Sequence, residues 1–204
     1  MKNKFLQLFE KKERFPFIPI VSGLQRSGTS LMMSMLAAGG LDVMTDHLRI
    51  ADVDNPVGYF ELEDVKKLIN GEHSWLAQSN GKAVKVISTL LPYLPDGYQY
   101  RIIFMRRTIE EVLASQRKML INRGENPHKI SDDQMAQMFQ NDLQQSERWL
   151  NSQSNATRIN INYRQLITHP GPLVAEINTF LGGSLDEDKM VAVIDPSLYR
   201  QRSS

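Results

Sequence analysis

An apolar run, a glycine-containing turn and a helical pattern follow one another between residues 17 and 40, and this succession constrains the fold most. The run FIPIV, residues 17–21, is bounded by a Ser-Gly pair and is typical of a buried parallel strand. Residues 28–38 place apolar side chains at helical spacing, and a Gly-Gly pair then predicts the end of the helix. A strand, a turn and a helix in this order predict an α/β fold.

Patterns further along the chain continue this alternation. Short apolar runs predict more buried strands over 83–87, 101–105 and 157–161. The predicted helices are an amphipathic helix within 1–15, a short helix over 62–69, two helices that begin with capping boxes at Thr108/Glu111 and Ser131/Gln134, a helix from Pro172 to Gly182, and a short turn near 186–193. The predicted loops are 41–60, a functional loop or lid, and 90–98. We therefore predict one three-layer α/β domain over residues 1–204, with a parallel sheet flanked by helices.

Composition limits the kinds of partner, cofactor and location that the chain can have. Lys and Arg number 24 against 23 for Asp and Glu, so no global field predicts nucleic acid or a membrane surface as a partner, and an anion site must be local. The chain has no Cys, which excludes disulfides, thiolate metal sites and thiol nucleophiles. His73, His128 and His169 have no partners at metal-binding spacing, so no metal site is predicted. Without a signal-like or membrane-spanning stretch, we expect a cytoplasmic protein.

The turn between the first strand and the first helix nearly matches a phosphate-binding loop. The run GLQRSGTS, residues 23–30, fits the P-loop pattern G-x-x-x-x-G-K-[ST] except that Thr29 stands in place of the lysine. P-loop NTPases use that lysine to neutralise the β- and γ-phosphates, so its loss argues against ATP or GTP hydrolysis. Arg26 instead supplies a charge inside the loop, which suits a single 5′-phosphate. Two alternatives are a tight turn without a ligand and a degenerate NTPase fold kept as a binding module.

This loop resembles the P-R/K-S-G-T-T/S loop of the sulfotransferases that use 3′-phosphoadenosine-5′-phosphosulfate (PAPS). The chain has Gln25 in place of the family's proline, and then the matching residues Arg26, Ser27, Gly28, Thr29 and Ser30. The resemblance implies a P-loop NTPase-like fold, PAPS as the co-substrate and no metal. It also implies that this loop holds the donor.

Two further motifs carry the resemblance, in the family's order. An arginine that ends a strand and a serine eight positions later bind the donor's 3′-phosphate in the family, and Arg107 and Ser115 have that spacing. Tyr163 begins the family's Y-x-x-L/M-x-x-x-P segment, in which the tyrosine contacts the adenine. The alternatives are an ion pair of Arg107 with Glu110 or Glu111, an exposed helix serine at 115, and a tyrosine that only closes the core.

The catalytic residues are less defined. Lys85, in the strand VKVIS, matches the family's basic residue near the transferring sulfuryl group, or else it is a strand lysine that reaches solvent. The family's catalytic histidine is missing, since Ile87 and Ser88 stand in its place. Candidates for the base that takes the acceptor's proton are Asp46, His47 and Glu61. Each of the three is otherwise a solvated loop residue.

The C-terminal Arg-Lys-Gly segment of many family members is also missing, and Arg200 and Arg202 are its only candidate substitutes. The resemblance implies a sulfotransferase that acts on a hydroxyl or amine of a small-molecule, lipid or carbohydrate acceptor. A catalytically weak nucleotide-binding module and a kinase-like phosphotransferase are the alternatives. Met119, Met135 and Met138 have helical spacing, and they either belong to the core or line an apolar pocket. The sequence predicts neither the acceptor nor the oligomeric state.

Overall fold

The computed structural model describes residues 16–49, 51–52, 54–56 and 58–198. The helix predicted within 1–15 and the two arginines at 200 and 202 lie outside the described residues. Among the described residues, no helix combines the length and the apolar character that crossing a membrane requires.

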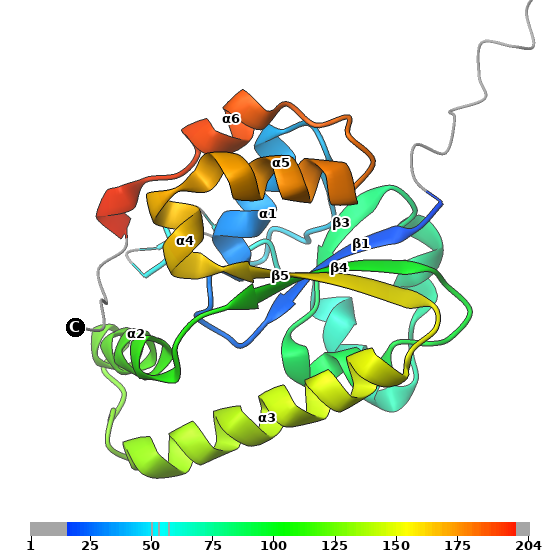
Figure 1. Ribbon diagram of the computed structural model, residues 1–204. Coiled ribbons are helices and arrows are strands. Elements are labelled where there is room, and N and C mark those ends of the chain that lie inside the picture. Colours follow the sequence, from blue (N-terminus) through cyan, green and yellow to red (C-terminus); the bar gives the residue numbers. More distant parts are fainter. Residues whose placement is uncertain (1–15, 50, 53, 57, 199–204) are drawn as a thin grey trace, which may run out of the picture.

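A five-stranded parallel sheet forms the centre of the molecule. Its strands lie in the order β2-β3-β1-β4-β5 (Figure 1), and every neighbouring pair is parallel. The strands are β1 (Ile18–Gly23), β2 (Asp42–Val43), β3 (Lys82–Lys85), β4 (Tyr100–Arg106) and β5 (Ala156–Asn162). The predicted parallel α/β sheet is thus confirmed. The prediction of a loop over 41–60 was wrong at its start, where β2 pairs with β3 through two residues.

Helices cover both faces of this sheet, which confirms the three layers. The α-helices are α1 (Thr29–Ala38), α2 (Ile109–Asn122), α3 (Asp132–Ser152), α4 (Tyr163–Thr168), α5 (Pro170–Phe180) and α6 (Glu187–Ala192). The 3₁₀-helices are η1 (Glu63–Asn70), η2 (Ser74–Gln78), η3 (Ser88–Tyr93) and η4 (Pro196–Leu198). Figure 1 shows α1, α4, α5 and α6 on one side of the sheet and α3 on the other.

Two hydrophobic cores lie on the two faces, because successive side chains of a strand point to opposite sides. Val21 and Ile103 pack with Met32 of α1 on one face. Ile20 and Ile102 pack with the 3₁₀-helices and the end of α3 on the other. Strands buried on both faces have continuous apolar runs, which is why β1 and β4 were predicted from the sequence.

The predicted capping boxes differ in outcome. At the start of α3, the Ser131 hydroxyl accepts from the Gln134 backbone N–H and the Gln134 side chain accepts from the Ser131 backbone N–H, so this box is confirmed. At the start of α2, the Thr108 hydroxyl accepts from the Glu111 N–H at 3.4 Å. The carboxylate of Glu111, however, pairs with Arg107 instead of closing the box.

Four other predictions of secondary structure needed correction. The short helix predicted over 62–69 is the 3₁₀-helix η1, and part of the loop predicted over 90–98 belongs to η3. The helix predicted from Pro172 begins at Pro170, and α4 before it was not predicted. Most of these elements are short, so their sequences contain too few residues to show a helical period.

The strand order places a crevice at the carboxyl end of β1. The connection from β1 through α1 to β2 passes one face of the sheet, and the connection from β3 through η3 to β4 passes the other face. In open parallel sheets, ligands bind where the connections diverge in this way. The turn after β1 lies at that point.

Candidate functional site

A cavity of about 350 Å³ lies at the carboxyl ends of β1, β3 and β4. Its walls come from the turn after β1, the described residues between 49 and 66, the end of β3, and α2 and α4. Among the described residues, six cationic ones line it against three acidic ones: Arg26, Arg49, Lys66, Lys85, Arg107 and Lys118, against Asp54, Glu61 and Asp195. The molecule as a whole is almost neutral. The positive charge is therefore local to this cavity, as an anion site requires.

The turn after β1 is shaped to cradle an anion. Arg26 has a φ of 67° and Gly28 a φ of 102°, so left-handed residues alternate with others along the turn. Backbone N–H groups in such a turn converge on one point, and the N-terminus of α1 adds partial positive charge. The hydroxyl of Ser27 donates to the Leu24 carbonyl at 2.7 Å and is buried. Ser27 thus stabilises the turn from the inside, whereas Gly28, Thr29 and Ser30 line the cavity.

Arg26 extends from this turn across the cavity to α2. Its Nε donates to the Ser115 hydroxyl at 3.0 Å, and its Nη2 donates to the Asp54 carbonyl at 3.1 Å. Ser115 is buried, so the alternative of an exposed helix serine is wrong. Two motifs that are 89 residues apart in the sequence therefore contact one another.

Arg107 is held beside the same turn by a buried ion pair. Its Nε lies 2.9 Å from Glu111 Oε2, and both side chains are buried. Its Nη1 donates to the Arg26 carbonyl at 3.0 Å, and its guanidinium lies 4.5 Å from the centre of the Tyr163 ring. The ion pair that was the alternative reading of Arg107 is thus present. It also fixes the guanidinium in the cavity wall.

Tyr163 packs directly against the turn. It is the first residue of α4, directly after β5, and it is buried. A Cβ atom added at Gly28 would lie 2.4 Å from Tyr163 Cδ2, so only glycine allows this approach. Tyr163 both joins the hydrophobic core and lines the cavity.

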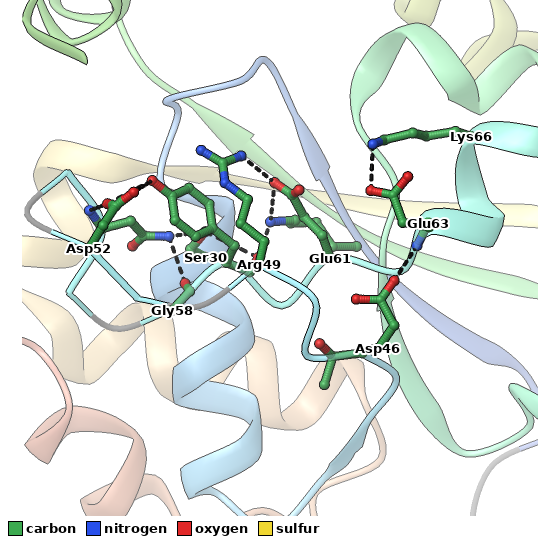
Figure 2. Close-up of polar contacts among 12 residues, drawn as sticks. Ser30, Asp46, Arg49, Asp52, Gly58, Glu61, Glu63 and Lys66 are labelled. Atoms are coloured by element: carbon green, nitrogen blue, oxygen red, sulfur yellow. Dashed lines mark hydrogen bonds and ion pairs between the residues drawn. The ribbon is translucent and has the colours of Figure 1, made fainter. Parts of the chain in front are cut away.

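The segment from Asp52 to Glu61 covers the cavity, and we call its described residues the covering segment. The Asn55 amide donates to the Ser30 hydroxyl at 2.9 Å and to the Gly58 carbonyl at 2.6 Å (Figure 2). The Tyr59 hydroxyl donates to Asp52 at 2.8 Å. The bond to Ser30 attaches the covering segment to the first turn of α1, and the other two hold the segment in its own shape.

Lys85, Glu61 and Arg49 form a charged cluster at the end of β3. Lys85 is buried, its ammonium donates to the Tyr59 carbonyl, and its Nζ lies 3.6 Å from Glu61 Oε1. Arg49 Nη1 lies 3.1 Å from the same carboxylate oxygen, and the Arg49 guanidinium stacks 3.3 Å from the centre of the Tyr59 ring. Figure 2 shows Arg49 and Glu61 pointing toward one another. Burial lowers the pKa of Lys85 to about 8, although the Glu61 carboxylate opposes this shift.

The three candidate bases lie in different surroundings. Glu61 lines the cavity, whereas Asp46 and His47 are not among its lining residues. The Asp46 carboxylate accepts backbone N–H bonds from Leu48 at 2.9 Å and Glu63 at 2.6 Å, which lower its pKa (Figure 2). His47 is exposed, with a left-handed φ of 57°. Glu61 is the one of the three that adjoins the cavity.

The sequence did not single out Arg49, Asn55 or Tyr59. All three belong to the irregular stretch between β2 and η1, where no periodic pattern marks a buried or inward-facing side chain. The turn residues around Asn55 and Gly58 predicted only a loop near the strand ends. Their contacts with Ser30 and Glu61 depend on how that loop folds back over the sheet.

Solved structures of three sulfotransferases have a similar fold. One is the sulfotransferase domain from the curacin biosynthetic pathway, with 13% sequence identity, a TM-score of 0.54, and 89% of this chain and 79% of that chain covered. Another is the sulfotransferase STF1 from Mycobacterium tuberculosis H37Rv, with 15% identity, a TM-score of 0.60, and 88% and 71% covered. The third is the sulfotransferase domain from the Synechococcus PCC 7002 olefin synthase, with 17% identity, a TM-score of 0.51, and 92% and 88% covered. No family model matches the sequence, and no curated protein matches it either. At these identities the likeness establishes the fold.

Proposed function

We propose that this chain, which has the sulfotransferase fold, transfers a sulfuryl group from PAPS to a hydroxyl or amine of a small-molecule, lipid or carbohydrate acceptor. The observation that carries the proposal is the hydrogen bond between Arg26 and Ser115. It brings the phosphate-binding turn and the serine of the 3′-phosphate motif to one cavity with an excess of cations. A donor that carries phosphates at both its 5′ and 3′ positions needs two such sites side by side.

Different residues of this chain are proposed to bind the different groups of the donor. Arg26 and the N–H groups of residues 28–30 hold the 5′-phosphate, which becomes the leaving group, and Ser27 supports the turn from inside. Arg107 and Ser115 hold the 3′-phosphate, with Glu111 fixing the guanidinium. Tyr163 contacts the adenine from the cavity wall. Arg200 and Arg202 are proposed as further contacts to the 3′-phosphate, outside the described residues.

Transfer is proposed as an in-line displacement at sulfur. The acceptor oxygen or nitrogen forms a bond to sulfur while the bond from sulfur to the bridging phosphate oxygen breaks, and that electron pair leaves with the 5′-phosphate. Arg26 stabilises the charge on the leaving phosphate, and Lys85 stabilises the sulfuryl oxygens. The acceptor's proton passes to a base, for which Glu61 is favoured over Asp46 and His47 because it lines the cavity.

Calorimetric titration tests this donor site directly. We expect adenosine 3′,5′-bisphosphate to bind without Mg²⁺, and ATP to bind much more weakly with or without Mg²⁺. Tight ATP binding with no response to the bisphosphate would favour the kinase-like alternative instead.

A binding module of the same fold is a second candidate, because Ile87 and Ser88 stand where the resemblance implies a catalytic histidine. The two proposals differ in turnover. A screen of labelled sulfate transfer over lipid, carbohydrate and phenolic acceptors, together with slow PAPS hydrolysis, distinguishes them. Bisphosphate binding without any hydrolysis or transfer would indicate the module.

Replacing Glu61 with glutamine should lower kcat for transfer about a hundredfold, because the amide cannot accept the acceptor's proton. The variant keeps the shape of the side chain, so donor binding should change little. His47→Gln is the matched control, since His47 is exposed and does not line the cavity. Equal losses in the two variants, measured as initial transfer rates, would exclude Glu61 as the base.

The pH dependence of transfer should show the titration of Lys85. Its pKa is about 8, so the ammonium that stabilises the sulfuryl oxygens is lost as the pH rises through that value. We expect kcat/KM, which reports ionisations of the free enzyme, to be about tenfold lower one pH unit above 8. Lys85→Met should be slower below pH 8 and should lack this decline. A profile of the natural protein that stays flat up to pH 10 would contradict the role of Lys85.

A further inference from the structure

A second cavity, of about 170 Å³, adjoins the first. It lies between η3, α2 and α3, and most of its wall is apolar, formed by Leu24, Ile87, Ile130, Met135, Met138 and Phe139. Gln25 and Ile87 line both cavities, so the two are neighbours on either side of these residues. Met135 and Met138, which the sequence assigned either to the core or to an apolar pocket, line this cavity. Unbranched methionine side chains let such a wall adapt to different ligands.

The two cavities differ in charge. Among the described residues, six cationic ones line the first cavity, whereas no Lys or Arg lines the second, whose lining includes Asp142. Within the described part of the chain, the Asp142 side chain makes no ion pair, and partial burial raises its pKa. Partial removal from water disfavours the charged form of a carboxylate, and a cation bound beside it would offset this cost.

A second acceptor group lies beside this cavity, on a residue that lines it. The side-chain oxygen Oε1 of Gln116, on α2, is buried and has no hydrogen-bond partner among the described residues. Buried side-chain oxygens nearly always accept a hydrogen bond, so an orphaned one requires an explanation. Among the described residues that line this cavity, Asp142 is the charged one. A carboxylate in a mostly apolar wall suits a ligand that carries a cationic N–H donor.

We propose that the second cavity is the acceptor subsite, and that it binds acceptors whose apolar chain ends in an ammonium group. This inference rests on the proposed sulfuryl transfer. Ile87 lies two positions after Lys85, so an acceptor that crosses Ile87 extends from the second cavity to the Lys85 and Glu61 cluster. The apolar chain packs on the two methionines, and the ammonium donates to the Asp142 carboxylate. The reacting hydroxyl then lies at the other end of the molecule.

Three probes with a six-carbon chain separate the contribution of the ammonium group to binding from that of the apolar chain. They are aminohexanol, hexanol and hydroxyhexanoate. Binding is measured without donor, by NMR of protein with labelled methionine methyl groups. Met135 and Met138 report binding in the second cavity, and Met32 of α1, which is buried in the core, reports any change in the protein as a whole. We expect aminohexanol to shift the first two signals and to bind more tightly than hexanol, and hydroxyhexanoate to bind least.

Two variants make this test specific. Asp142→Asn keeps the shape of the side chain and removes its charge, so it should weaken aminohexanol binding about tenfold and leave hexanol unchanged. Asp133→Asn is the matched control, because Asp133 is an exposed carboxylate of the same helix that lines neither cavity. Equal binding of aminohexanol and hydroxyhexanoate, or no effect of Asp142→Asn, would overturn the proposal.

The same samples distinguish this inference from the proposed function. Adenosine 3′,5′-bisphosphate is titrated into the natural protein and Asp142→Asn, and it should bind both equally because Asp142 does not line the first cavity. Failure of the bisphosphate to bind would contradict the donor site and leave the methionine readout intact. Bisphosphate binding without any response to aminohexanol would overturn the acceptor subsite alone.

Discussion

Replacing Arg26 with alanine should lower sulfuryl transfer about a thousandfold and weaken the binding of adenosine 3′,5′-bisphosphate by at least tenfold. Arg26 is the charged side chain of the phosphate-binding turn, and it extends into the cavity as far as Ser115. Charge builds on the leaving phosphate during transfer, so the guanidinium stabilises the transition state more than the bound donor. The loss should therefore be larger in kcat than in donor affinity, which single-turnover and binding measurements separate.

The fold of the Arg26→Ala variant should survive. The Arg26 side chain is only partly buried, and its Nε and Nη2 bonds join it to polar groups at the edge of the cavity. Arg26 already has a left-handed backbone conformation. Alanine would adopt the same conformation, so the substitution does not increase the backbone strain. Arg123→Ala is the control, because Arg123 is exposed and lies outside the cavity lining. Transfer rates that fall equally in both variants would contradict the assignment.

Much of the fold could be predicted because its central elements repeat a pattern. β1 and β4 are buried on both faces and pair over six residues, so their apolar runs are long enough to identify. β2 could not be identified, because it consists of two residues, which are too few to show the alternation of apolar and polar side chains that marks a strand. The 3₁₀-helices η2 and η3 were missed for the same reason: each presents only one or two turns.

The site residues that lie close together in the sequence could be predicted, and those that the fold brings together from distant segments could not. Arg107 and Ser115 lie on one strand-helix unit, so the resemblance to the sulfotransferases could identify both from a short stretch of sequence. The contact of Arg26 with Ser115 could be expected only once the order of the strands was known. Arg49 and Asn55 could not be predicted, since their partners Glu61 and Ser30 meet them through the tertiary path of an irregular segment. The capping-box pattern at Thr108 even assigned the wrong partner to Glu111, because the ion pair with Arg107 competes for the same carboxylate.

Replacing Gly28 with alanine should reduce the free energy of unfolding by about 3 kcal/mol and abolish measurable bisphosphate binding. Two effects add at this position. Its φ of 102° is strained for any residue with a Cβ atom, and that atom would lie 2.4 Å from Cδ2 of Tyr163. The Tyr163 ring is buried between the turn and Arg107, so it has little room to move. The turn must then shift, and its N–H groups no longer converge on one phosphate.

Gly40 allows the two effects to be measured separately. Its φ of 91° is similar, but a Cβ atom there would meet nothing within 4 Å. Gly40→Ala should therefore cost only the conformational part, about 1 kcal/mol in urea unfolding, with bisphosphate binding unchanged. A double-mutant cycle of Gly28→Ala with Tyr163→Leu then measures the steric part, which should appear as a favourable coupling. If Gly28→Ala costs no more than Gly40→Ala, the close packing of Tyr163 does not hold the turn in its phosphate-binding shape.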